Sequence, residues 1–150
     1  MSQPPAIVDS HCHLDFADFD GEVDDVIARA AAAGVTRMVT ICTRLANEPK
    51  VRAIAEAHDG IFYAAGIHPM SVEKQPLVSV DDLVALAGHP KMVGIGETGL
   101  DYHYTPDSAD LQRQSLRIHI DAARETGLAM GTPVICGTID AAAEAVSVGV

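Results

Sequence analysis

The stretch Ala6-Ile7-Val8-Asp9-Ser10-His11-Cys12-His13 follows two prolines and changes from apolar to polar within a few residues. An apolar run of this kind is typical of a short buried strand, and the polar cluster is typical of the turn that ends it. The same order recurs at 61–68, which ends in His68, and at 92–97, which ends in Glu97. The sequence therefore predicts several strands that carry a histidine or a glutamate at their carboxyl ends.

Helical patterns separate these strands along the chain. Apolar residues recur at helical spacing from Gly21 to Ala33, and Gly34 follows at a position where helices commonly end. The expected strands are 6–9, 35–41, 61–67, 92–95 and 133–135, and the expected helices are 21–33, 47–59, one from 81, 107–127 and one from 140. Strands that alternate with helices form right-handed βαβ units in a parallel sheet. We therefore expect an α/β fold.

Composition limits the classes of function. The chain has 150 residues, enough for one domain with a real core, and a formal net charge of -11. A broad positive surface for a nucleic acid is therefore excluded, and a nucleic-acid substrate would need a local source of positive charge. The three cysteines are far apart, which favours a reducing cytoplasm over a disulfide framework. No apolar run is long enough for a membrane span, so we expect no membrane partner.

His11 and His13 are candidates for a metal site. In extended backbone, residues two apart project to the same side and can converge on one cation. Asp9 shares this parity and could accept a hydrogen bond from an imidazole N–H. The alternative interpretation is that His11 and His13 are ordinary surface or capping histidines and that Asp9 is a turn residue.

Glu97, Asp101 and His68 extend this set. Glu97 ends an apolar strand, where a metal would neutralise a carboxylate that is costly to bury; pairing with an arginine or exposure at the strand mouth is the alternative. Asp101 could position water or a metal ligand, or be an ordinary loop aspartate. His68 could face the same pocket and contact a phosphate, or be a loop histidine without a role. Cys12 has no identified base and is expected to be a small buried residue.

Three segments together resemble the successive motifs of the TatD family of metal-dependent deoxyribonucleases. They are Val8-Asp9-Ser10-His11-Cys12-His13-Leu14-Asp15, Ala65-Gly66-Ile67-His68-Pro69 and Val93-Gly94-Ile95-Gly96-Glu97-Thr98-Gly99-Leu100-Asp101-Tyr102. The resemblance covers residues 6 to about 128 and includes the helix start Leu111-Gln112-Arg113-Gln114. It implies a TIM (β/α) barrel hydrolase that cleaves DNA phosphodiester bonds, often as an exonuclease.

The resemblance also implies roles for individual residues. His11 and His13 would bind one metal, Glu97 would be a carboxylate ligand able to bridge to a second, and His68 would lie near the substrate phosphate. The cofactors would be one or two divalent ions, Mg²⁺, Mn²⁺ or Zn²⁺. With Asp101, these residues are the expected site, and DNA would be reached through the metal ions rather than through a basic surface.

The resemblance weakens after residue 128. Aligning 133–135 with the family's next strand places Cys136 where the family has a histidine ligand, so we expect 129–150 to be divergent. We expect 1–150 to be the N-terminal part of a single TatD-like domain, an incomplete barrel of about five βα units. Such a chain would self-associate through its uncovered edge or be inactive. The alternatives are another amidohydrolase-type metal-dependent hydrolase or a non-catalytic metal-binding fragment.

Overall fold

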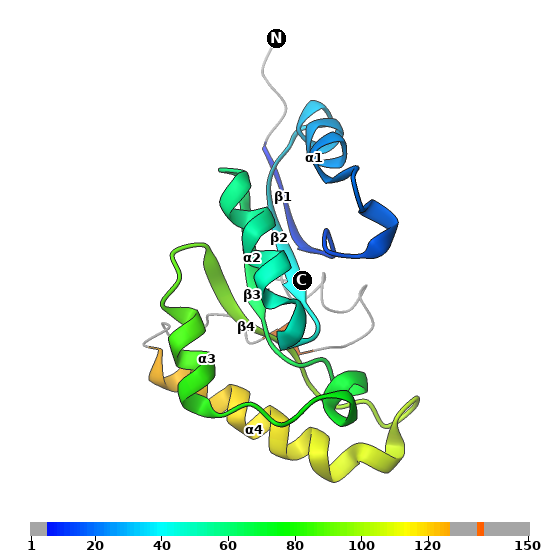
Figure 1. Ribbon diagram of the computed structural model, residues 1–150, viewed down its shortest axis with the longest axis vertical. Coiled ribbons are helices and arrows are strands. Elements are labelled where there is room, and N and C mark those ends of the chain that lie inside the picture. The colour runs from blue at the N-terminus through cyan, green and yellow to red at the C-terminus, as the bar shows by residue number, and fades with distance from the viewer. Residues whose placement is uncertain (1–5, 127–134, 137–150) are drawn as a thin grey trace.

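The computed structural model describes residues 6–126 and 135–136, which form a parallel sheet covered by helices (Figure 1). The strands and α-helices, in chain order, are β1 (Ile7–Cys12), α1 (Val23–Ala32), β2 (Val35–Cys42), α2 (Glu48–Ala57), β3 (Ile61–Ala65), α3 (Val80–Ala87), β4 (Met92–Thr98), α4 (Ala109–Glu125) and β5 (Ile135–Cys136). The part of the chain that the structure describes contains no helix long and apolar enough to cross a membrane.

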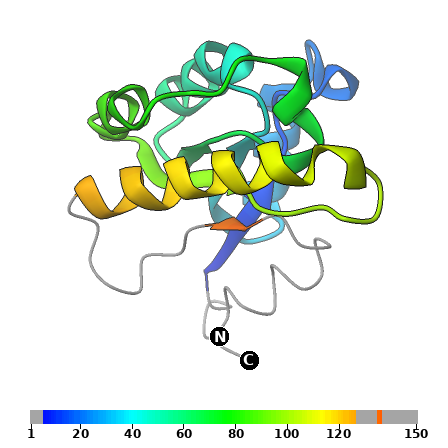
Figure 2. The same ribbon diagram turned by 90° about the horizontal axis from the view of Figure 1, so that it is seen from below.

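The strands lie in the sheet in sequence order, β1-β2-β3-β4-β5, and every neighbouring pair is parallel. Right-handed crossovers that always step in the same direction place their helices on one face, as in a (β/α) barrel; a doubly wound sheet reverses its order instead. Figure 2 shows α4 running along one side of the sheet, where it packs against α3 and β4. The predicted α/β fold and incomplete barrel are confirmed.

The hydrophobic core lies between the sheet and its helices. Tyr63 and Ile61 of β3, Val51 of α2 and Leu83 of α3 are almost completely buried in one cluster. Burying each of the three aliphatic side chains, Ile61, Val51 and Leu83, contributes about 1.5–3 kcal/mol. The core therefore fixes the middle strands most firmly.

Strand β1 differs from the middle of the sheet. Its first residues, Ile7 and Val8, are 52% and 57% exposed. Within the described residues, β1 pairs only with β2, so it is an edge strand whose outer side is open to a further strand. Self-association through an uncovered edge stays a prediction, and it concerns this strand.

The helix boundaries follow local chemistry. Gly34 ends α1 with a φ of 95°, which a glycine adopts without steric cost. Ser79 caps α3 through a capping box with Asp82, and the helix begins at Val80, one residue earlier than expected. Asn47 stands at the N-cap of α2 as expected, but its side chain makes no cap bond and instead donates to Asp15 at 3.5 Å.

Two strands run further than the sequence suggested. Strand β1 continues to Cys12 and β4 continues to Thr98, because Cys12 pairs with Thr40 and Thr98 pairs with Cys136 in the parallel ladders. The third strand ends at Ala65, two residues early. Of the expected fifth strand, Ile135 is confirmed; its earlier residues and the helix from 140 lie outside the described residues.

Candidate metal centre

The candidate metal centre lies at the carboxyl ends of β1 and β4. His11, His13 and Glu97 each offer one ligand atom, and these atoms all lie within 4.8 Å of one another. Two strands separate β1 from β4, so in a flat sheet they would lie about 14 Å apart. The curvature of the sheet, together with the reach of long side chains, therefore creates this group.

The ring of His13 is oriented by the backbone of β2. Its Nδ1 lies 3.1 Å from the carbonyl oxygen of Ile41, which can only accept a hydrogen bond. Nδ1 therefore carries the proton, and the lone pair of a neutral ring is on Nε2. The ring also stacks on Phe16, with centroids 4.6 Å apart and planes at 12°. This is the arrangement that a metal-binding histidine needs, with one nitrogen held by a carbonyl and the other available.

Glu97 lies between two imidazoles. Its Oε2 is 3.9 Å from Nε2 of His11, and its Oε1 is 3.6 Å from Nε2 of His68. The residue is only 3% exposed, so its charge is largely removed from water. A buried carboxylate of this kind needs a compensating charge, and a cation or a protonated imidazole would provide it.

The neutral ring of His68 has the opposite tautomer to that of His13. Its Nδ1 accepts a hydrogen bond from the backbone N–H of Met70 at 3.1 Å, at the start of the 3-10 helix Pro69–Lys74. In the neutral ring the proton is therefore on Nε2, the nitrogen that faces Glu97. His68 is thus arranged as a hydrogen-bond donor at the edge of the ligand group, whereas His13 is arranged as an acceptor.

The two aspartates near the centre bind backbone groups. Oδ1 of Asp9 accepts from the backbone N–H of His11 at 3.0 Å. Oδ1 of Asp101 accepts from the N–H groups of His103 and Tyr104, each at 3.0 Å, and its Oδ2 accepts from Oγ1 of Thr105. These hydrogen bonds, that of Tyr104 first, lower the pKa of Asp101 below its ordinary value. Both carboxylates thus organise loops beside the ligand group.

Gln112 is a functional candidate for which the sequence pattern predicts no role. It is fully buried on α4, and its amide oxygen accepts from the N–H of Asp101 at 2.7 Å. Its amide nitrogen donates toward the carbonyl oxygens of Asp101 at 3.0 Å and Thr105 at 2.8 Å. A glutamine in the first turns of a helix after a glycine-rich strand end was the only available sign. Gln112 fixes the whole loop that follows Glu97.

Two further contacts hold the ends of β3 and β4 together. A Cβ on Gly66 would lie 2.7 Å from Cα of Gly96, so only glycine allows this close approach of the two backbones. The buried His119 of α4 accepts a hydrogen bond from the N–H of Ile67 at 3.1 Å and bonds the carbonyl oxygen of Ser115 through Nδ1. His119 is therefore structural and supports the residue before His68.

Cys12 does not resemble a nucleophile. Burial, followed by the charges of Asp9 and Asp15, raises the pKa of its thiol to about 12. Its Sγ lies 3.5 Å from the carbonyl oxygen of Val39. A thiol at neutral pH in this setting stays protonated, which agrees with the interpretation of Cys12 as a small packed residue.

The three candidate ligands fit a divalent cation. Ligand atoms bound to one ion at about 2.0–2.2 Å lie within about 4.4 Å of one another, so only small side-chain movements are required. Two imidazoles and a carboxylate suit Zn²⁺ and also accept Mn²⁺. Cys136, which aligns with a histidine ligand of the family, lies in β5, and its side chain is outside the described residues.

Comparisons with known proteins identify a family and several relatives of this chain. The TatD related DNase family matches residues 8–145, a range that includes the segment after residue 128. The chain is 38% identical over 145 residues to the uncharacterized metal-dependent hydrolase YcfH of Escherichia coli K12, covering 95% of this chain and 52% of that protein. It is 34% identical to the putative deoxyribonuclease TATDN3 of Mus musculus, covering 79% of this chain and 45% of that protein.

A solved structure is similar as well. The TatD homologue YjjV of Escherichia coli K12 superimposes with a TM-score of 0.74 at 32% identity, covering 81% of this chain and 48% of that one. The chain thus spans about half the length of the relatives it matches. With the family matched over most of its residues and the fold shared with a solved homologue, the chain belongs to the TatD related DNase family.

Proposed function

We propose that this chain carries metal-binding residues of a hydrolase that cleaves DNA phosphodiester bonds. The single observation that supports this most is the convergence of His11, His13 and Glu97, whose ligand atoms lie within 4.8 Å of one another at the carboxyl ends of barrel strands. That end of a (β/α) barrel is where active sites lie. DNA as the substrate rests on the name of the family and of the mouse relative.

In this proposal, His11, His13 and Glu97 hold one or two ions of Mg²⁺, Mn²⁺ or Zn²⁺. When bound, such ions supply an activated water and positive charge for the phosphate oxygens. Ile41 keeps the His13 ring in the tautomer that binds metal. His68, with its proton on Nε2, donates a hydrogen bond to a phosphate oxygen.

Asp101 acts through the loop in this proposal. Both of its carboxylate oxygens are used by loop donors, so it positions the segment after Glu97 rather than a water. The net charge of -11 leaves the metal as the main source of positive potential for a polyanion. The free thiols of Cys12 and Cys42 support a reducing cytoplasm as the compartment.

The test compares the chain with Glu97→Gln, and with Glu56→Gln as a matched control on α2. Glu56 pairs with His89 at 3.0 Å and its side chain is 57% exposed, far from the ligand group in sequence. Manganese affinity is measured by calorimetry, and cleavage of a single-stranded oligonucleotide is measured with and without a chelator. We expect Glu97→Gln to lose at least about 100-fold in metal affinity and to abolish cleavage.

The possible outcomes separate the alternatives. Cleavage that survives both the chelator and Glu97→Gln would refute the proposal. Metal binding that depends on Glu97 without any cleavage would favour the non-catalytic metal-binding fragment. Metal-dependent hydrolysis of an amide or ester substrate, with DNA left intact, would favour an amidohydrolase-type enzyme.

A further inference from the structure

Exposed apolar side chains gather at one end of the sheet. Eight large hydrophobic residues of the described chain are exposed, and three of them, Ile7, Val8 and Val93, belong to strands. The other five lie in segments that follow the carboxyl ends of β1, β3 and β4; they are Phe16, Met70, Leu100, Tyr102 and Tyr104. Single exposed apolar residues are ordinary, but a group around a candidate catalytic centre indicates contact with a ligand.

Three of these residues belong to the loop between β4 and α4, which projects beside the start of α4 in Figure 1. Tyr102 is 52% exposed and Tyr104 is 73% exposed. Neither ring belongs to the hydrophobic core cluster. Core packing therefore does not explain why two aromatic rings stand in this loop.

The loop itself is held firmly. The carboxylate of Asp101 accepts from the backbone N–H of Tyr104, and Gln112 bonds the backbone at Asp101 and Thr105. Nη1 of Arg113 donates to the hydroxyl of Tyr102 at 3.1 Å. The rings of His103 and Tyr104 meet edge to face with centroids 4.5 Å apart. The rings are thus presented on an ordered support, which lowers the entropy lost when a ligand stacks on them.

The loop is also within reach of the candidate metal centre. Tyr102 is five residues after Glu97, and a chain spans at most about 3.6 Å per residue, so their Cα atoms are no more than about 18 Å apart. This distance corresponds to a few nucleotides of a single strand whose phosphate is at the metal centre. With a net charge of -11, the protein gains little from phosphate contacts elsewhere, whereas stacking on aromatic rings needs no positive charge.

We propose that the loop 100–105 is a binding subsite for the bases of single-stranded DNA, in which Tyr102 and Tyr104 stack on nucleotides next to the phosphate held at the metal centre. This inference rests on the proposed function for its substrate. Because every base has a flat π-face, the subsite accepts any sequence and selects unpaired over paired bases.

The test measures binding of fluorescein-labelled, phosphorothioate-linked thymidine 12-mers by anisotropy in the presence of Mn²⁺, so that a phosphate group can bind at the metal centre while cleavage is slow. The comparison probe is a 12-mer of the same phosphate number in which all residues are abasic. We expect the chain to bind the base-containing strand at least about tenfold more tightly, in the range of stacking on one or two rings. We also expect this ratio to stay nearly constant between 50 and 200 mM salt (about fourfold in concentration), because it does not depend on counterion release.

Substitutions of the two tyrosines test whether their rings cause the tighter binding of the base-containing strand. The double substitution Tyr102→Leu with Tyr104→Leu removes both rings and should bring the ratio to about one, whereas Tyr102→Phe with Tyr104→Phe keeps the rings and should retain it. Both positions are exposed, so thermal unfolding should be unchanged in all variants.

Equal affinity for the two probes, absence of binding, or a ratio that survives the leucine substitutions would overturn the subsite. Glu97→Gln should leave the ratio unchanged while it removes cleavage. If the base-containing strand binds more tightly than the abasic strand but is not cleaved, only the proposed hydrolysis is contradicted. If DNA is cleaved but the two strands bind equally, only the subsite is contradicted.

Discussion

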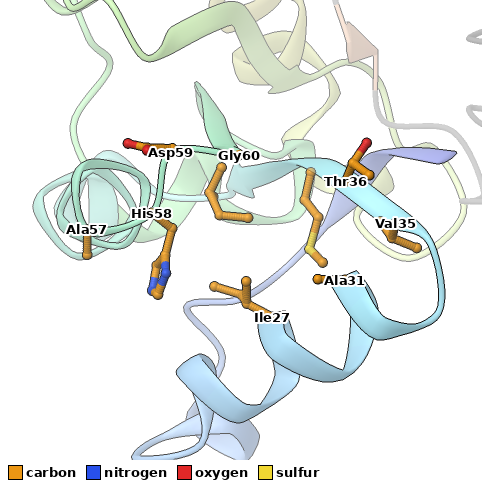
Figure 3. A pocket seen from close by; sticks show the side chains of 10 residues that line it. Ile27, Ala31, Val35, Thr36, Ala57, His58, Asp59 and Gly60 are labelled. Carbon is orange, nitrogen blue, oxygen red and sulfur yellow. The ribbon is translucent and has the colours of Figure 1, made fainter. Parts of the chain in front are cut away.

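The two ends of the sheet differ in what they bring together. At the carboxyl end, His11 of β1 and His13, which directly follows this strand, meet Glu97 from β4 in a group that is nearly closed to solvent at Glu97. At the amino end, a hollow of about 390 Å³ lies between α1, the end of α2 and the starts of β2 and β3 (Figure 3). It is lined by Ile27, Ala31, Val35, Thr36, Met38, Ala57, His58, Asp59, Gly60 and Ile61.

A hollow by itself is not a functional site. The amino-end hollow is lined by a mixture of aliphatic and polar residues, and its histidine, His58, pairs with the exposed Asp24 at 3.1 Å. The carboxyl end has a set of ligand atoms fixed by strand ladders and by backbone hydrogen bonds. In barrels, residues at this end serve catalysis and those at the amino end serve stability.

The largest expected effect is at Gln112, which supports the loop at the carboxyl end. Gln112→Ala would leave the half-buried backbone groups of Asp101 and Thr105 without their partner, at a cost of about 1–3 kcal/mol in unfolding free energy. The matched control is Gln114→Ala, an exposed position on the same helix, which should change stability by less than about 0.5 kcal/mol. Urea unfolding measures both, and similar losses in the two variants would contradict the role of Gln112.

Alanine substitutions at two glycines, one at each end of the sheet, compare the two ends directly. A Cβ on Gly66 would lie 2.7 Å from the backbone of Gly96, and a Cβ on Gly60 would lie 2.7 Å from the carbonyl oxygen of Thr36. Each alanine variant should therefore cost about 2 kcal/mol of stability through overpacking. Only Gly66→Ala should also weaken manganese binding, because it displaces the strand segment that carries Glu97. Equal metal affinities in the two folded variants would show that the ligand group does not depend on this close approach.

The smallest expected effect is a pH dependence from His119. Burial lowers the pKa of this histidine below its ordinary value of 6.5, so between the two pKa values the unfolded chain binds more protons than the folded one. Stability should therefore fall as the pH decreases below about 6.5, with a slope of at most about 1.4 kcal/mol per pH unit.

Urea unfolding between pH 5 and 8 measures this slope. We expect His119→Gln to flatten it, while His103→Gln, at an exposed position, should leave it unchanged. A slope that is the same in all three chains would assign the acid sensitivity to other groups.

The alternation of strands and helices could be predicted from the sequence, because hydrophobic periodicity and glycines such as Gly34 act locally. The candidate ligands could also be proposed, since His11 and His13 are two apart on one strand and Glu97 ends another. The residues at which β1 and β4 end could not be predicted from the sequence. Each strand is lengthened by pairing with a residue far away in the chain, Thr40 for β1 and Cys136 for β4.

The sequence by itself therefore determined the α/β class, the order of the elements and the residue types available for metal chemistry. Only the tertiary structure decided that the ligand atoms of His11, His13 and Glu97 lie within 4.8 Å of one another, and that Gln112 secures the loop beside them. The physical reason is that periodicity and capping depend on near neighbours. The meeting of β1 with β4 depends on the curvature of the whole sheet, and the orientation of each ring depends on backbone groups brought from other strands.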